Sequence, residues 1–299
     1  MKYGVILGHG LDKGIGFPDY VVPAAQTAEK LGFESVWIGE HAVIPKHDTP
    51  YPFTPDGRLP FPNETPIPDP LIWLAYVAGA TSTINLGAGA VILPQRQALL
   101  LAKETATLDK LSGGRLLLGV AAGWLPEESE ALGVPFARRG ARLDEHITTL
   151  RRVWREAAPT INGDFTQVEE AISYPKPARV GGPPVIICGA SVAAAKRAGR
   201  MADGFYPMVG SPQELPRLIG IVRTAALEAG RDPSDIEITV GSFTLATEQL
   251  FTEEAVEDIR GYQEAGVDRL VLFRTGDVTV DDITRSMDHF MTKVVSKVS

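Results

Sequence analysis

The chain alternates along its length between two kinds of segment. A helix-like stretch ends at a glycine and, after one or two further residues, a short apolar run begins, as after Gly32 and after Gly266. Glycine readily adopts the left-handed backbone conformation that ends a helix. Short, continuous apolar runs are typical of strands buried on both faces of a parallel sheet. The repeat therefore predicts helices and strands in alternation.

Eight strands are predicted, at residues 3–8, 35–40, 84–93, 115–120, 184–189, 203–207, 236–241 and 268–273. Helical patterns accompany them, at residues 20–31, 70–82, 98–112, 139–157, 191–201, 212–229, 252–265 and 279–296. Such alternation implies parallel strands joined by right-handed crossovers. Eight units in a chain of 299 residues favour closure into a single (β/α)8 TIM barrel over an open doubly wound sheet, which is the alternative.

Two segments depart from the repeat, and we expect them to be insertions in one domain of residues 1–299. Residues 42–69 follow the second strand and contain eight prolines, which exclude regular helix and central strand. A long loop at the carboxyl end of a strand is either an active-site wall or a surface excursion. Residues 158–183 precede the fifth strand and combine a turn signal at 162–164 with a possible short strand at 165–168.

Charge and cysteine content restrict the location and the partners of the chain. The net charge of −8 argues against non-specific binding to nucleic acid or to an anionic membrane, although a local cluster of donors could still bind an anion. No apolar run is long enough for a membrane span. The single cysteine, Cys188, lies in an apolar run, which favours a buried hydrophobe over a nucleophile. We therefore expect a cytoplasmic protein with a small-molecule substrate.

In a TIM barrel, side chains at the carboxyl ends of the strands are the candidates for catalysis. The second strand ends at Glu40 and His41, a carboxylate and an imidazole that could hold a polar edge of a ligand or transfer a proton. The alternatives are an ion pair and a core histidine with a satisfied hydrogen bond. His9, at the end of the first strand, is a second candidate.

Small residues mark the ends of the third and fourth strands. Gly87 and Gly89 lie inside the third strand, where glycine indicates a bulge or a close approach of the backbone to another group. Either a flat ligand lies against this strand, or helices pack closely on it. The fourth strand runs into residues 119–124, whose small side chains are followed by Trp124, a large amphipathic group. This segment suits a ring system, although the same residues also serve ordinary packing.

The fifth strand leads directly into a helix through Gly189, Ala190 and Ser191. Unpaired N–H groups and the helix dipole favour an anion at a helix N-terminus. Glycine lets the backbone come close to a ligand, and Ser191 adds a hydroxyl donor. The alternative is that Ser191 only caps the helix.

Missing motifs argue against several classes of chemistry. The chain contains no metal-ligand spacing such as H-E-x-x-H, no nucleophile elbow, and no phosphate-loop or dinucleotide-binding fingerprint after the first strand. We therefore expect no metal ion. With few side chains suited to covalent chemistry, a bound cofactor is the more attractive source of reactivity.

Several longer motifs fit one known family when they are taken together. They lie at residues 69–71, 86–96, 108–115, 119–124, 130–133 and 138–142. With them, the chain resembles the luciferase-like monooxygenase superfamily over nearly its whole length. This superfamily includes flavin-dependent monooxygenases and relatives that use coenzyme F420, a deazaflavin. The core motifs, together with the proline-rich loop after His41, are most similar to the F420-dependent branch.

The resemblance implies that the barrel mouth holds the isoalloxazine or deazaflavin ring, supported by a bulge in the third strand with a cis peptide bond between Gly89 and Ala90. It also places Glu40 and His41 near the reacting face. The residues that it implies for cofactor binding are Ala88, Gly89, Ala90, Gly119, Ala122, Gly123 and Trp124 at the ring and Gly189, Ala190 and Ser191 at the phosphate.

One departure from the family pattern bears on the substrate. In the deazaflavin relatives that oxidise sugar phosphates, a glutamate acid follows the glycine of the fourth strand, whereas this chain has Trp124 there. The difference argues against sugar-phosphate oxidation and leaves His41 as the best group for proton transfer. Flavin-using members share the Gly–Trp pair, so the resemblance leaves both cofactors open.

The leading hypothesis is an oxidoreductase that transfers a hydride between coenzyme F420 and an organic substrate. His41, oriented or tuned by Glu40, would manage the accompanying proton. The alternative is a monooxygenase that uses reduced FMN, and a third reading is a non-catalytic flavin-binding protein on the same barrel. We expect no nucleic-acid or membrane partner and a possible homodimer.

Overall fold

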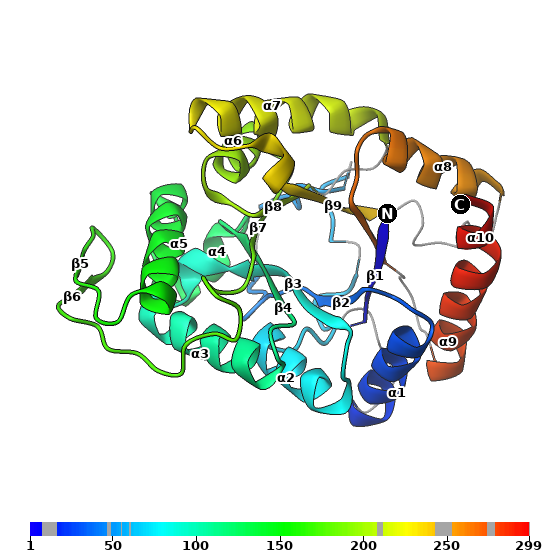
Figure 1. The fold of residues 1–299 in the computed structure, drawn as a ribbon, viewed down its shortest axis with the longest axis horizontal. Coiled ribbons are helices and arrows are strands. Elements are labelled where there is room, and N and C mark those ends of the chain that lie inside the picture. Colours follow the sequence, from blue (N-terminus) through cyan, green and yellow to red (C-terminus); the bar gives the residue numbers. More distant parts are fainter. Residues whose placement is uncertain are drawn as a thin grey trace.

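The computed structural model describes residues 1–7, 17–46, 49–54, 56–59, 61–207, 212–242, 253–273 and 279–298. In this part of the chain, parallel strands close into a barrel in the order β1-β10-β9-β8-β7-β4-β3-β2 (Figure 1). The barrel strands are β1 (Lys2–Ile6), β2 (Ser35–Ile38), β3 (Asn85–Ile92), β4 (Leu116–Ala121), β7 (Val185–Cys188), β8 (Gly204–Tyr206), β9 (Glu237–Ser242) and β10 (Arg269–Leu272). The predicted (β/α)8 TIM barrel is confirmed.

Helices surround the barrel on its outside (Figure 1). They are α1 (Phe17–Lys30), α2 (Pro70–Ala80), α3 (Ala98–Leu111), α5 (Arg139–Arg155), α6 (Val192–Met201), α7 (Leu215–Glu228), α8 (Glu253–Glu264) and α9 (Val280–His289), which continues through a π-helical turn (Phe290–Val294) into α10 (Val295–Val298). Each predicted helix is therefore present, with bounds that differ by a few residues. None of the described helices is long and apolar enough to cross a lipid bilayer.

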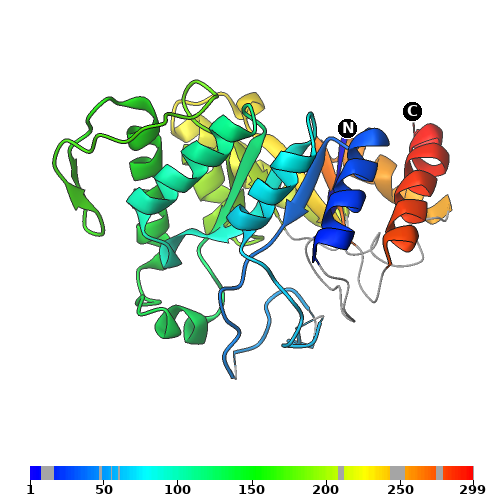
Figure 2. The same cartoon turned by 90° about the horizontal axis from the view of Figure 1, so that it is seen from below.

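The structure adds short elements that the sequence pattern did not indicate. They are α4 (Pro126–Ala131) and the 3-10 turns Leu93–Gln95 and Pro233–Asp235. The first turn of the helix predicted at 212–229 is a 3-10 turn, Pro212–Glu214, which precedes α7. A helix of six residues spans fewer than two turns, so its apolar periodicity cannot be recognised. Helix α4 nevertheless matters, because it lies at the same end of the barrel as the first insertion (Figure 2).

The second insertion forms a small antiparallel hairpin. Its strands are β5 (Ile161–Asn162) and β6 (Gln167–Val168), so the predicted short strand at 165–168 is present only in its second half. The carboxylate of Glu145 on α5 accepts hydrogen bonds from the backbone N–H groups of Asp164, Phe165 and Thr166. The hairpin is thereby fixed to the outer side of α5, away from the barrel axis (Figure 1).

The barrel interior is filled by the indole of Trp37, which is fully buried and donates a hydrogen bond of 2.7 Å to the Ser35 hydroxyl. A Cβ atom on Gly87 would lie 2.2 Å from this ring, and one on Gly89 would lie 3.1 Å from it. The flat group against the third strand is therefore a side chain of the chain itself. Neither a ligand nor close helix packing is needed to explain Gly87.

The amino end of the barrel is closed by ion pairs. Arg269, whose side chain is 2% exposed, donates to both oxygens of Glu34 at 2.7 and 2.8 Å and also bonds Glu237. Glu237 in turn bonds Lys2. Burial acts to raise the pKa of Glu34, but Arg269 outweighs it and holds this pKa below its usual value. A ligand site is therefore to be sought at the opposite, carboxyl end.

Candidate functional site at the carboxyl end of the barrel

Three strand ends that carry predicted site residues are neighbours in the barrel. Strand β4 pairs with β3 on one side and with β7 on the other, and Ile92 is in register with Ala121. Parallel strands end at the same edge of a sheet, so residues near the carboxyl ends of β3, β4 and β7 lie next to one another. They are Gly89 and Ala90 in the second half of β3, Ala122 to Trp124 after β4, and Gly189 to Ser191 after β7.

Strand β3 is irregular where the bulge was expected. Its pairing with β4 shifts register between Ala88 and Val91, and the Gly89–Ala90 peptide bond is cis, as the resemblance implied. Gly89 and Ala90 are partly exposed, whereas Ala88 is fully buried. Gly119 is also buried, and a Cβ atom there would lie 2.1 Å from the Ala88 carbonyl oxygen. Ala88 and Gly119 thus pack against each other inside the barrel wall, below the partly exposed residues.

The turn after β4 depends on glycine. Gly123 has φ of +85°, and a Cβ atom there would lie 2.9 Å from Cγ2 of Ile92. Its carbonyl oxygen accepts a hydrogen bond of 3.2 Å from Nε of Arg139, whose guanidinium stacks on Phe136. Burial lowers the pKa of Arg139 from its usual value. Arg139, on α5, was not singled out from the sequence, because this contact spans 16 residues and depends on the fold.

The turn after β7 exposes the start of α6. Gly189 has φ of +131°, and its N–H donates to the carbonyl oxygen of Tyr206 at 3.0 Å. The Ser191 hydroxyl accepts a hydrogen bond of 3.1 Å from the N–H of Ala194, so the expected helix cap is present. Ser191 and the two residues after it are exposed. The cap therefore leaves the first turn of α6 accessible to an anion.

His41 is held by a carboxylate from α4. Nδ1 of His41 lies 2.9 Å from Oε2 of Glu128, and Oε1 of Glu128 accepts hydrogen bonds from the N–H groups of Ala42 at 2.7 Å and Val43 at 3.3 Å. The Glu128 side chain is 1% exposed and that of His41 is 12% exposed. Nε1 of Trp124 lies 3.4 Å from Nε2 of His41. The histidine thus contacts two groups at the barrel mouth.

Glu40 does not orient His41, contrary to the expectation from their adjacency. Oε1 of Glu40 accepts from Nε of Arg96 at 2.7 Å, and Oε2 accepts from the N–H of Ile92 at 2.5 Å. Arg96 also bonds Asp69, which caps the start of α2. Burial raises the pKa of Glu40, although Arg96 opposes this effect. Glu40 therefore joins an ion pair with Arg96, while His41 reaches Glu128.

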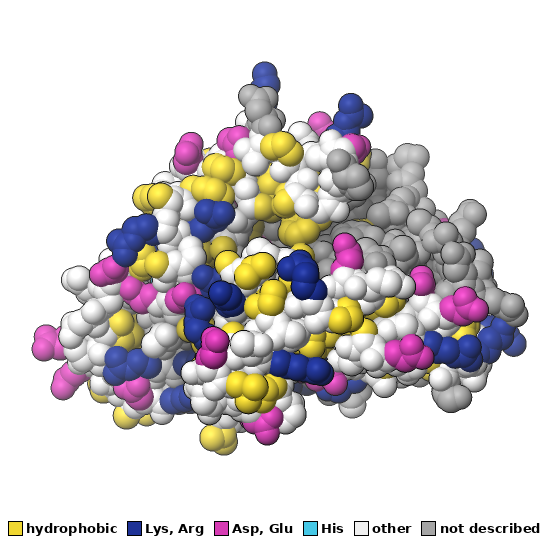
Figure 3. Space-filling view, turned by 90° about the horizontal axis from the view of Figure 1, so that it is seen from above, with side chains coloured by type: hydrophobic (Ala, Val, Ile, Leu, Met, Phe, Trp, Pro, Cys, Tyr) yellow, Lys and Arg dark blue, Asp and Glu magenta, His cyan; other side chains and the backbone are white. Residues whose placement is uncertain are grey.

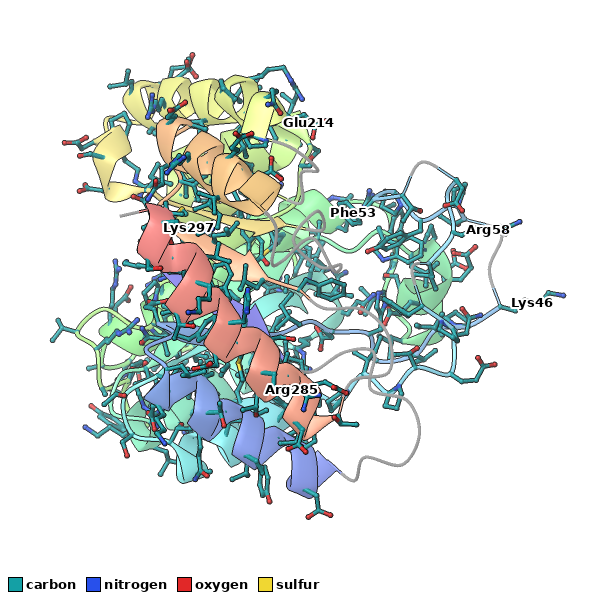
Figure 4. All side chains as sticks on the ribbon, turned by 90° about the vertical axis from the view of Figure 1, so that its right-hand side faces the viewer. Lys46, Phe53, Arg58, Glu214, Arg285 and Lys297 are labelled. Carbon is teal, nitrogen blue, oxygen red and sulfur yellow. The ribbon has the colours of Figure 1, made fainter. Side chains whose placement is uncertain are left out.

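The first insertion contacts the site through aromatic rings. Tyr51 meets the ring of Trp124 at a centroid distance of 5.2 Å and that of Phe53 at 5.3 Å. Burial raises the pKa of Tyr51 to about 12. Phe53 lies on the side of the insertion that is nearer the barrel, whereas Lys46 and Arg58 lie at its outer edge (Figure 4). Of the two alternatives left open for residues 42–69, these contacts favour a wall of the site.

Some expectations concern residues outside the described part of the chain. His9 belongs to this group, as does residue 8 at the end of the first predicted strand. Among the described residues, no three His, Cys, Asp or Glu side chains are grouped in a way that could hold a metal ion. On the face seen in Figure 3, basic and acidic side chains are interspersed and form no continuous basic patch.

Residues 1–274 match the family model described as luciferase-like monooxygenase, and the chain belongs to this family. An uncharacterized protein of Mycobacterium bovis is 32% identical over 243 residues, which cover 80% of this chain and 83% of the relative. An F420-dependent glucose-6-phosphate dehydrogenase of Amycolatopsis mediterranei is 30% identical over 230 residues, which cover 75% of this chain and 64% of the relative. The resemblance found in the motifs is therefore confirmed.

Solved structures with the same fold occur with either cofactor. An F420-dependent secondary alcohol dehydrogenase in complex with an F420-acetone adduct has a TM-score of 0.78 and 20% identity, covering 100% of this chain and 99% of the other. The oxygenating constituent of 3,6-diketocamphane monooxygenase of Pseudomonas putida, in complex with FMN, has a TM-score of 0.71 and 18% identity, with coverage of 100% and 99%. At these identities the likeness concerns the fold alone.

Proposed function

We propose that the chain is an oxidoreductase that transfers a hydride between coenzyme F420 and an organic substrate. The observation that carries this proposal is the arrangement at the barrel mouth. His41, bonded to Glu128, stands at the end of β2, and the open start of α6 follows β7. Between them lie the ends of β3 and β4, which have small side chains. The F420-dependent relative that is 30% identical supports the choice of cofactor.

The residues at the mouth fit a planar ring that carries a phosphate. Ala90, Ala122 and Gly123 are partly exposed and present no more than a methyl group, so a flat ring could lie against their backbone. The exposed first turn of α6 offers N–H groups and the positive end of a helix dipole. In this proposal, Ala90, Ala122 and Gly123 hold the ring, and Gly189, Ala190 and Ser191 hold the phosphate.

The proposed role of the protein is to position the substrate and to handle protons. When bound, the deazaflavin would supply the redox chemistry, because it can donate or accept a hydride. His41 takes up or releases a proton at Nε2 as the substrate is oxidised or reduced. Trp124 and Tyr51 shield that atom from bulk water on one side, since their rings pack against each other and His41 contacts Trp124.

A monooxygenase that uses reduced FMN is the second candidate. It is favoured by the Gly123–Trp124 pair, which the resemblance associates with flavin-using members as well, and by the FMN complex of the camphane enzyme on the same fold. Consumption of oxygen with reduced FMN would support this candidate. A non-catalytic flavin-binding protein would bind cofactor yet show no turnover over a broad substrate screen.

Titration with F420 and FMN, using wild type, Ser191→Asp and Ser191→Asn, tests the proposal. We expect wild type to bind F420 at least about tenfold more tightly than FMN. Aspartate and asparagine both cap helices well, so both variants should fold like wild type. A carboxylate beside the phosphate adds repulsion, so Ser191→Asp should weaken F420 binding by about tenfold or more while Ser191→Asn stays close to wild type.

Two outcomes of these titrations contradict the proposal in different ways. Tight binding of FMN without any binding of F420 would overturn the cofactor assignment. Equal affinity of the aspartate and asparagine variants for F420 would show that the phosphate does not bind at the start of α6. That result would leave the identity of the cofactor open.

A further inference from the structure

Glu128 contacts both the backbone at the start of the first insertion and the ring of His41. Oε1 accepts hydrogen bonds from the N–H groups of Ala42 at 2.7 Å and Val43 at 3.3 Å. Backbone N–H groups can only donate, so Glu128 meets them with an acceptor oxygen. Oε2 lies 2.9 Å from Nδ1 of His41, and the side chain is 1% exposed. A buried carboxylate in this position favours a proton on Nδ1.

The other nitrogen of His41 faces a donor. The indole N–H of Trp124 cannot accept a hydrogen bond, and its Nε1 lies 3.4 Å from Nε2 of His41. The two rings meet edge to face, with centroids 5.9 Å apart and an interplanar angle of 82°. A proton on Nε2 would point at another proton, so Trp124 favours a lone pair there. The groups on both sides of the imidazole therefore select the same tautomer.

We propose that Glu128 is a positioning residue that fixes the tautomer of His41, so that the neutral imidazole carries its proton on Nδ1. Nε2 then carries the lone pair and is the atom at which the proton of the reaction is exchanged, once the substrate replaces the 3.4 Å contact to Trp124. This last clause rests on the proposed function, whereas the tautomer rests on contacts within the chain alone. Glu128 acts through His41 and contacts neither substrate nor cofactor in this account.

The substitution Glu128→Gln separates this role from a purely structural one. Glutamine has nearly the same size, and its amide oxygen can still accept from Ala42 and Val43, so the start of the insertion stays anchored. Its NH2 group then faces Nδ1 of His41 as a donor. Nδ1 must accept, and the proton moves to Nε2. The variant therefore inverts the tautomer while it leaves the anchor in place.

Glu127→Gln is the matched control. Glu127 is the neighbouring residue of α4, and its carboxylate accepts from the Thr49 hydroxyl at 2.9 and 3.1 Å. The control thus removes the same charge from the same helix, beside the same insertion, without a change at His41. It should keep the wild-type tautomer.

The tautomer is read by long-range 1H–15N NMR of protein with 15N-labelled histidine, without cofactor, at a pH where His41 is neutral. The signal of His41 is assigned by its absence in His41→Ala. We expect the proton on Nδ1 in wild type and in Glu127→Gln, and on Nε2 in Glu128→Gln. A proton on Nε2 in wild type, or the same tautomer in wild type and Glu128→Gln, would overturn the proposal.

Kinetics with F420 test the functional half separately. Glu128→Gln should lower kcat by about 10²-fold or more, the usual scale for a lost acid–base group, with little change in KM. If Glu128→Gln shows the inverted tautomer but an unchanged kcat, Nε2 of His41 does not take part in proton transfer. If wild type shows no turnover with F420 but the tautomers behave as expected, the proposed function fails and the role of Glu128 in orienting His41 stands.

Discussion

Replacement of His41 by alanine is expected to lower turnover by about 10²-fold or more, because the variant loses the group that exchanges a proton with the substrate. The affinity for F420 should remain close to that of wild type, since the residues proposed to hold ring and phosphate belong to β3, β4 and the start of α6. Glu128 keeps its hydrogen bonds to Ala42 and Val43, so the local backbone should persist. Steady-state kinetics and an F420 titration measure the two effects.

His289→Ala is the control for this experiment. His289 is an exposed residue at the end of α9, a helix on the outside of the barrel. Its removal should leave turnover near the wild-type value. Turnover of His41→Ala that equals the control would exclude His41 from the mechanism. A large loss of F420 affinity in His41→Ala would instead make His41 a binding residue.

Replacement of Trp37 by alanine is expected to produce the largest loss of stability, about 3–5 kcal/mol in the free energy of unfolding. The side chain is fully buried in the barrel interior, where it meets Tyr206 edge to face at 5.5 Å. Gly4 and Gly87 lie against it and have no side chains that could turn into the cavity left by the indole. Urea unfolding followed by circular dichroism measures the change.

Leu227→Ala serves as the reference for the stability measurement. This leucine is 67% exposed on α7, and its loss should change the free energy of unfolding by less than about 0.5 kcal/mol. If Trp37→Ala unfolded at the same urea concentration as Leu227→Ala, the packing of the indole inside the barrel would not contribute to the stability of the fold. The glycines of β1 and β3 would then need another explanation.

The barrel could be predicted because its signals are local. The glycines after several helices and the short apolar runs are recognised within a few residues, and the number of helix–strand units implies closure. Gly32 and Gly266 both have positive φ in the structure, as expected of residues that end a helix. Helix α4 was not predicted, because its six residues are too few to show a helical pattern of apolar positions.

The contacts of the candidate site could not be predicted, because they join residues far apart in the chain. Glu128 reaches His41 across 87 positions, and Arg96 reaches Glu40 across 56. Adjacency in sequence suggested that Glu40 serves His41, but the two side chains bond different partners, Arg96 and Glu128.

Glycine posed a second difficulty. Its presence in β3 indicates that something approaches closely, yet the pattern cannot distinguish a ligand from a residue of the same chain. At Gly87 the neighbour is Trp37, and at Gly119 it is the carbonyl of Ala88. The cofactor is open for a related reason, since one barrel supports several chemistries and its fold does not select among them.

A crystal structure of the protein with bound F420 tests the central proposal most directly. We predict density for the deazaflavin ring against the backbone at Ala90, Ala122 and Gly123, close to Nε2 of His41, with the phosphate at the first turn of α6. A ring bound elsewhere on the molecule, or a phosphate remote from Ser191, would contradict the account.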